Sequence, residues 1–170
     1  MRRILLLMAA VLCITVASAQ EKGETTLGAQ VVYGSGDGLS NIGIGAEFQW
    51  NVINNLRLAP SFTYFLKKDY VSMWNGGVDV HYLFPVSDLI TLYPLAGVGM
   101  WGVKVSVPEV DLGEYGSYGG SVSDTEFGFN VGGGVDFNLS EKFAINAEIK
   151  YKLGGDWNRL LISAGVAYKF

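Results

Sequence analysis

The sequence predicts an all-β fold, an eight-stranded antiparallel up-and-down transmembrane β-barrel. Three observations support this prediction. Apolar and polar residues alternate along most of the chain, which is typical of strands with two different faces. The alternating segments are about ten residues long or longer, whereas strands of soluble proteins average about 5–6 residues. The N-terminus has the form of an export signal.

The composition narrows the class of protein. The chain has 170 residues, which suits one domain, and only 16% of them are charged, against about 25% in soluble domains. Its 23 glycines and 13% aromatic residues argue against disorder, which requires low hydrophobicity and high charge. A formal net charge of −4 argues against a basic nucleic-acid-binding protein.

The first residues predict a cleaved signal peptide. A basic start, Met1–Arg3, precedes an apolar run over 4–16 and the small residues Ala17-Ser18-Ala19. We expect cleavage after Ala19, so that residues 1–19 are the signal peptide and 20–170 the β-barrel domain. A membrane anchor is the alternative, but the run is shorter than the ~20 residues that a spanning helix needs.

The cysteine count excludes several kinds of chemistry. Cys13 is the only cysteine and lies in the signal region. It follows Leu12 rather than a small residue, which disfavours a lipoprotein. The mature chain then has no cysteine, so disulfides, thiolate catalysis and cysteine-bound metals are excluded.

Eight strands can be placed along the mature chain. The connections at 51–54, 85–88 and 139–142 are short, and those between them are mostly longer, the longest being 102–125. Alternation of tight turns with longer loops is typical of an up-and-down membrane barrel. The predicted strands are 25–33, 41–50, 55–66, 73–84, 89–101, 126–138, 143–153 and 159–170.

The two faces of these strands differ in chemistry. One face is apolar and carries no charge, as with Leu160, Ile162 and Val166 in the last strand. A soluble β-sandwich has the same alternation with the charges outward. Export, strand length and the many glycines of the polar face favour a barrel with a crowded polar lumen. The charged or titratable residues predicted to face the lumen are Glu47, Arg57, Asp79, His81, Asp136, Glu148, Lys150, Lys152, Arg159 and Lys169.

Aromatic residues on the apolar face gather near both ends of the strands. With the N-terminus in the periplasm, the periplasmic girdle is Trp50, Tyr82, Phe84, Phe137, Phe143, Tyr168 and Phe170, and the outer girdle is Tyr33, Tyr64, Trp74, Phe127 and Tyr151. Two aromatic belts around an aliphatic band are the pattern of a bilayer-spanning barrel.

The whole mature chain resembles the small outer-membrane barrels of Gram-negative bacteria, of the outer membrane protein A and X type and the broad porin family. The residues that carry the resemblance are the alternating last strand ending in Tyr168-Lys169-Phe170 and the segment 92–99. The resemblance implies location in the outer membrane and contact with its lipid, and we expect a monomer. It also implies that Tyr168 and Phe170 form the signal for the barrel-assembly machinery.

The lumen charges have two interpretations. Four acidic and five basic residues are nearly balanced, which favours an ion-pair network that fills the barrel and fixes the register. A turn at 51–54 would place Glu47 across from Arg57. The alternative is a narrow passive pore for small solutes, which long Arg and Lys side chains would obstruct.

Enzymatic activity is the less favoured reading, and we expect no catalytic residues, cofactor or metal. The single histidine, His81, lies near Asp79, but a catalytic triad must converge on an accessible substrate. The segment 97–102 matches the glycine pattern of a dinucleotide-binding fingerprint. It is followed by strand-like alternation instead of the helix that such a site requires, so we reject the match. No histidine or carboxylate cluster has metal-ligand spacing along the sequence.

The long connection 102–125 is the candidate recognition loop. Val103, Val105 and Val107 extend the alternation of the preceding strand. This predicts either a strand that protrudes above the membrane or a bulge near Trp101. The loop could be a solvated segment or a contact surface for a partner, since tyrosine, serine and glycine suit adaptable binding surfaces. The candidate residues are Glu109, Asp111, Glu114, Tyr115 and Tyr118.

Overall fold

The computed structural model describes residues 22–36, 39–68, 70–111, 117–154 and 158–170. The predicted signal peptide, residues 1–19, lies outside this part of the chain. None of the described residues forms a helix that is long and apolar enough to cross a membrane. The strands are β1 (Thr25–Gly36), β2 (Leu39–Ile53), β3 (Leu56–Lys68), β4 (Val71–Tyr82), β5 (Phe84–Pro85), β6 (Ile90–Asp111), β7 (Ser117–Asn138), β8 (Phe143–Leu153) and β9 (Arg159–Lys169).

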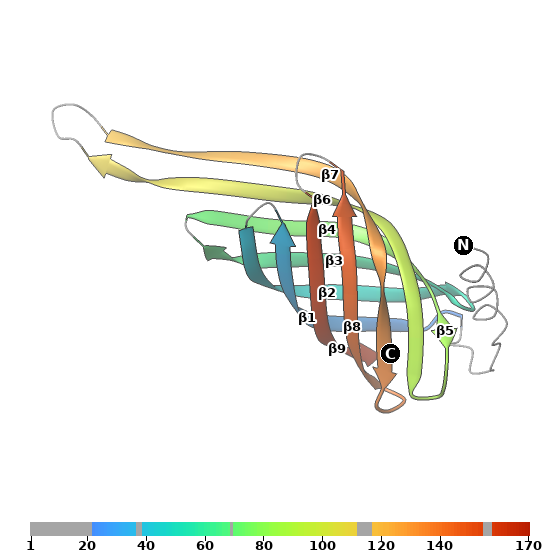
Figure 1. Ribbon diagram of the computed structural model, residues 1–170. Helices are drawn as coiled ribbons and strands as arrows, with labels where there is room; N and C mark the ends of the chain where they lie inside the picture. Colours follow the sequence, from blue (N-terminus) through green and yellow to red (C-terminus); the bar gives the residue numbers. More distant parts are fainter. Residues whose placement is uncertain (1–21, 37–38, 69, 112–116, 155–157) are drawn as a thin grey trace.

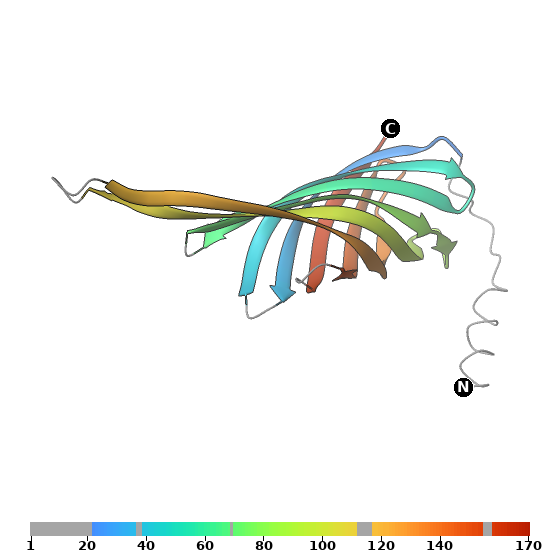
Figure 2. The ribbon, with the colours of Figure 1, turned by 90° about the horizontal axis from the view of Figure 1, so that it is seen from above.

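The strands form one closed antiparallel barrel (Figures 1 and 2). Each long strand pairs with the next along the chain, β9 pairs with β1, and the pairing of β4 with β6 completes the ring. The two-residue strand β5 continues the course of β4 after Leu83 and pairs with β6. The predicted eight-stranded up-and-down barrel is therefore confirmed, with one short additional strand.

The largest departure from the expected strand boundaries concerns β6 and β7. The predicted strands 89–101 and 126–138 are each 22 residues long in the structure. Their pairing is unbroken from Ile90↔Phe137 to Val107↔Gly120. Most of the predicted loop 102–125 is therefore a β-hairpin that projects beyond the other strands (Figures 1 and 2). The loop prediction was wrong because two alternating strands stabilise each other even where no third strand flanks them.

The protrusion settles the choice between the two explanations of the valine alternation. Trp101 pairs with Glu126 without a bulge, and the register shift lies between Val107 and Val110. The strand therefore continues outward, and Val103 and Val105 stay on the same face as Trp101.

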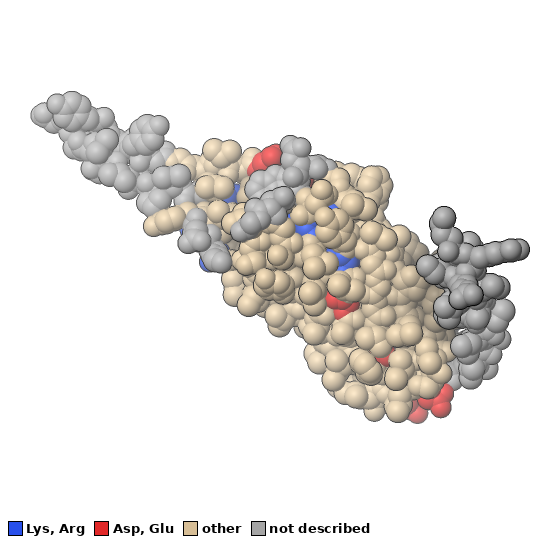
Figure 3. Space-filling model, viewed as in Figure 1, with Lys and Arg blue, Asp and Glu red and all other residues tan. Residues whose placement is uncertain are grey.

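The barrel has its apolar side chains outside and its polar ones inside. Ile44, Ile149 and Val166 are each more than half exposed on the wall, whereas Asp79 and His81 are fully buried in the lumen. Figure 3 shows a surface mostly free of charged side chains, with charges confined to small patches. Transfer of apolar surface from water to an apolar medium is favourable, so this outer wall is suited to contact with the hydrocarbon of a lipid bilayer.

Two apolar groups lie among the polar lumen side chains. One is Val32, Phe65, Met73, Trp101 and Leu161, near the outer end, and the other is Leu83, Tyr93 and Leu95, near the short turns. Glycines make room for the larger lumen residues. A methyl group at Gly97 would collide with Asp79, and one at Gly134 would lie 2.5 Å from the Tyr93 ring.

Candidate functional site in the barrel lumen

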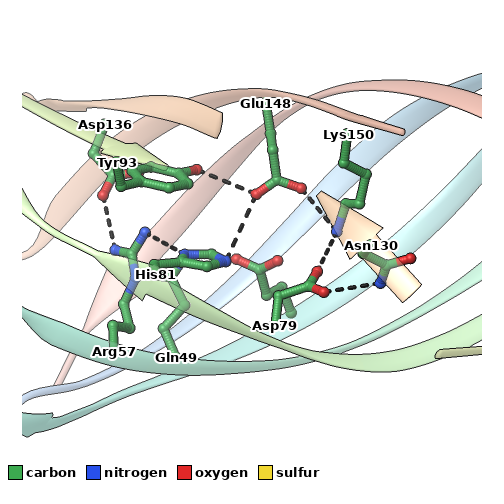
Figure 4. Close-up of polar contacts among 10 residues, drawn as sticks. Gln49, Arg57, Asp79, His81, Tyr93, Asn130, Asp136, Glu148 and Lys150 are labelled. Atoms are coloured by element: carbon green, nitrogen blue, oxygen red, sulfur yellow. Dashed lines mark hydrogen bonds and ion pairs between the residues drawn. The ribbon is translucent and has the colours of Figure 1, made fainter. Parts of the chain in front are cut away.

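The section of the lumen nearer the short turns holds a group of buried charges from strands on opposite sides of the barrel (Figure 4). Arg57 Nη1 of β3 lies 2.8 Å from Asp136 Oδ2 of β7. Lys150 Nζ of β8 lies 2.6 Å from Asp79 Oδ2 of β4 and 2.8 Å from Glu148 Oε1. All five side chains are at most 7% exposed. The alternation predicted which residues face inward, and barrel closure brings these particular partners together.

Neutral polar groups complete this arrangement. Asn130 Nδ2 donates to the second oxygen of Asp79 at 2.8 Å, and Gln49 Nε2 donates to Glu47 Oε1 at 2.6 Å. Tyr93 lies under the Arg57 guanidinium, whose carbon is 4.7 Å from the ring centre. These hydrogen bonds and cation–π contacts offset part of the cost of removing the charges from water.

His81 has different neighbours from those expected for a catalytic histidine. Arg57 donates to His81 Nδ1 from Nε at 3.2 Å and from Nη2 at 3.0 Å. The imidazole stacks on Tyr93 with ring centres 4.6 Å apart. Asp79 instead bonds Asn130 and Lys150. His81 and Asp79 are close in the sequence, but they do not form a hydrogen-bonded pair in the lumen.

The expected opposition of Glu47 and Arg57 was wrong. Glu47 lies across from Ser61, and Arg57 lies across from Asn51. β2 continues to Ile53, the register shifts between Asn51 and Ile53, and Asn55 takes a φ of 70° in the turn. The hairpin therefore turns later than expected, which moves Arg57 toward the short-turn end of the barrel and away from Glu47.

Three ligand-type side chains meet although their spacing along the sequence gave no such indication. Oxygen or nitrogen atoms of Glu47, His81 and Glu148 lie within 4.8 Å of one another, and all three residues are buried. Glu47 Oε2 and His81 Nε2 have no hydrogen-bond partner in the described part of the chain. Because Arg57 donates to Nδ1, the neutral ring carries its proton on Nε2, and no lone pair there faces a metal. The group suits a bridging water better than a metal ion.

Long side chains from several strands meet in the section of the lumen nearer the β6–β7 hairpin. The rings of Phe65 and Trp101 stack with centres 5.6 Å apart. Arg159 reaches across from β9, with its guanidinium carbon 5.4 Å from the Trp101 ring and Nη1 3.1 Å from Met73 Sδ. Lys152 Nζ lies 4.5 Å from the Trp101 ring centre. These contacts lie on the hairpin side of the ion pairs.

The remaining predicted residues lie at the barrel ends and on the wall. Lys169, at the short-turn end, is partly buried and bonds Asn138 Oδ1 at 2.9 Å, with Glu24 Oε1 at 3.5 Å. All twelve predicted girdle residues are exposed or half-buried on the outer wall. Tyr168 packs edge-on against Phe170 at 5.1 Å.

The candidate recognition residues divide into two groups. Glu109 and Asp111 belong to β6 and Tyr118 to β7. Glu114 and Tyr115 lie outside the described residues.

The sequence prediction missed several uncharged lumen residues. These residues occupy the alternate positions of their strands that face the lumen, and they are at most 5% exposed. They are Tyr93, Trp101, Gln49 and Asn130. Their positions in the alternation are visible in the sequence, but the predicted lumen set contained only the charged residues and His81.

The chain matches the family described as "Outer membrane protein beta-barrel domain" over residues 4–170. It belongs to this family. Together with the closed barrel and its apolar wall, this identifies an integral protein of the Gram-negative outer membrane. Comparison with curated proteins finds no match.

Several solved structures share the fold. Ail, the attachment invasion locus protein of Yersinia pestis, is 22% identical with a TM-score of 0.61, covering 88% of this chain and 99% of Ail. The N-terminal β-barrel domain of OprF from Pseudomonas aeruginosa is 16% identical with a TM-score of 0.63, covering 89% and 100%. Neisserial surface protein A is 21% identical with a TM-score of 0.63, covering 86% and 96%.

Proposed function

We propose that this barrel is a non-enzymatic surface protein whose β6–β7 hairpin binds a protein partner outside the cell, while the ion pairs fill and stabilise the lumen. The observation that carries the proposal is the length of the hairpin. Beyond the barrel, only β6 and β7 continue in the described part of the chain, and they pair with each other as far as Asp111↔Ser117.

The outer part of the hairpin has unpaired edges. β4 covers β6 only as far as Val105, and β8 covers β7 only from Phe129 onward. Among the described residues, 117–128 of β7 therefore have no strand on the side away from β6. Such an edge offers backbone donors and acceptors to an added strand of another protein.

Charge favours a protein over a sulfated polysaccharide as the partner. Segment 102–125 contains four acidic residues and one basic residue, Lys104. Ail has also been solved in complex with the heparin analogue sucrose octasulfate. An acidic hairpin repels such a polyanion, so attachment by this chain would use a different ligand chemistry.

The lumen geometry supports a filled barrel rather than a pore. The Phe65–Trp101 stack and the Arg159 side chain occupy the outer section, and the ion pairs of Arg57 and Lys150 cross the inner one. The buried His81 accepts hydrogen bonds from Arg57 at Nδ1, and its Nε2 lies 3.9 Å from Glu148 Oε2 inside the lumen. These contacts favour a structural role for the lumen charges.

Hairpin truncation tests the proposal. Replacing residues 108–119 with Asn-Gly joins the paired residues Val107 and Gly120 through a turn that suits a hairpin. Cells displaying the full chain should bind animal-cell monolayers, and cells displaying the truncated chain should not. Protease treatment of the monolayer should abolish binding, and heparinase should leave it unchanged.

A folding control accompanies this assay. The truncated barrel should retain heat-dependent gel mobility, since the deletion leaves all pairing below Val107 intact. Ser123→Lys, which places a charge on the β7 edge without shortening it, should reduce binding at equal surface expression. Equal binding by the truncated and full chains, or loss of binding with heparinase, contradicts the proposal.

A further inference from the structure

A cavity of about 140 Å³ lies between the barrel mouth and the inner face of the hairpin. Val103, Val105 and Val122 form its wall, and the last two are paired across the strands. Val122 is 74% exposed. It lies three residues beyond the level of Gly102, which pairs with Trp74 of the outer girdle, or about 10 Å at strand spacing. An apolar wall held beyond the membrane favours a ligand with an apolar body.

The size of the cavity limits that body. An enclosed apolar cavity of about 150 Å³ accommodates one benzene ring. The cavity beside Val103 therefore has room for a single ring or a short branched chain, with its polar group directed to the floor or the opening.

The floor of the cavity is formed by buried side chains that carry hydrogen-bond donors. Trp101 and Arg159 line it and are 4% and 1% exposed. Trp101 Nε1 has no hydrogen-bond partner among the described residues, and the same is true of Nζ of the fully buried Lys152. Lys152 is not among the side chains that line the cavity, and its Nζ lies 4.5 Å from the Trp101 ring centre. Both atoms are donors only, so the group that satisfies them is an acceptor.

The rim carries the opposite charge. Asp124 and Glu126 line the cavity across from Val103 and Trp101. Asp124 is exposed and accepts a hydrogen bond from the backbone N–H of Thr125 at 2.8 Å. Water screens exposed charges, whereas buried charges interact strongly. The buried cations Arg159 and Lys152 therefore influence the head group more than the exposed Asp124 does. The half-buried Glu126 opposes them.

We propose that this cavity binds a small organic carboxylate, with a single ring or short alkyl body against the valine wall and the carboxylate toward Lys152, Arg159 and Trp101 Nε1. This ligand matches the wall by apolarity and the floor by charge. The site is separate from the hairpin edge, and it requires neither the hairpin tip nor a protein partner.

Three probes with the same phenyl ring test the head group. Phenylacetate, 2-phenylethanol and phenethylamine are titrated against the refolded chain in nanodiscs, and the indole N–H resonance of Trp101 is followed by NMR. Phenylacetate should shift the resonance saturably, with a Kd of about 1 mM for a ligand of this size. The alcohol and the amine should bind at least about tenfold more weakly, as expected when a charged hydrogen bond is lost.

Each contrary result overturns the proposal. Equal binding of phenylacetate and 2-phenylethanol removes the role of the buried cations. Tighter binding of phenethylamine assigns the head group to the rim carboxylates. If none of the probes shifts the resonance up to about 10 mM, beyond the affinity expected for this size, the cavity is not a ligand site.

Substitutions locate the site. Lys152→Met keeps the length of the side chain and should weaken phenylacetate about tenfold, with less effect on the alcohol. Val122→Asn changes an exposed wall residue, should leave folding unchanged and should weaken all binding. Its matched control is Leu139→Asn at the opposite end, where Leu139 is 64% exposed and affinity should not change. If Lys152→Met does not fold, the pair Val122→Asn and Leu139→Asn still decides whether the cavity is the site.

Discussion

Arg57→Met should strongly destabilise the folded barrel. Arg57 Nη1 lies 2.8 Å from Asp136 Oδ2, and the two side chains are 4% and 5% exposed. At this distance of 2.8 Å, an effective dielectric constant of about 20 gives an attraction of about 6 kcal/mol between unit charges. Desolvation offsets part of this attraction, so removal of one partner from a buried pair costs about 3–5 kcal/mol.

The cost of about 3–5 kcal/mol also includes the loss of other contacts of Arg57. Arg57 also donates twice to His81 and lies over Tyr93. Adding Asp136→Leu to Arg57→Met removes the unpaired carboxylate but does not restore these contacts. The double variant should therefore be more stable than Arg57→Met alone, by roughly 1–2 kcal/mol, and less stable than the parent.

Urea titration of the refolded barrel in vesicles measures these differences, with tryptophan fluorescence and heat-dependent gel mobility as probes. Lys169→Met is the control, because its partner Glu24 is 3.5 Å away and both side chains are partly exposed. It should cost less than about 1 kcal/mol. An Arg57→Met cost as small as that of the control would refute the reasoning, since it would mean that water screens the lumen charges.

Three further predictions concern the wall, the charge balance and the lumen. Val166 is 59% exposed on the outer wall, and Val166→Arg should destabilise the folded barrel by roughly 2–4 kcal/mol near the bilayer midplane. Ser163→Thr in the lumen should cost little in the same vesicle titration. Equal effects of the two substitutions would reverse the assignment of faces. Glu47→Gln should leave the unfolding free energy unchanged or raise it, because Glu47 bonds Gln49 and has no cation within ion-pair distance in the described chain, and a loss above about 2 kcal/mol would mean that its charge is paired. The parent chain should give no discrete current steps in a planar bilayer if the stacked Phe65 and Trp101 rings obstruct the outer lumen as proposed, whereas regular steps from the parent would favour the narrow-pore alternative.

The faces, the number of long strands and most strand positions follow from the sequence, because alternation is a local property. Each strand meets lipid on one side and the lumen on the other, so every second residue is selected for a different solvent. The parity that places Val166 outward and Ser163 inward is visible without coordinates. The same parity would also have identified Tyr93 and Trp101 as lumen residues.

The partners across the lumen depend on the tertiary structure alone. Arg57 and Asp136 are 79 residues apart, and Lys150 and Asp79 are 71 apart. Which charges meet depends on the stagger of the closed barrel and on the position of each turn, and the late turn after β2 was enough to separate Glu47 from Arg57. The hairpin is decided in the same way, since β6 and β7 remain strands beyond the barrel only because they pair with each other. Alternation thus determined which way each residue faces, and closure determined what it faces.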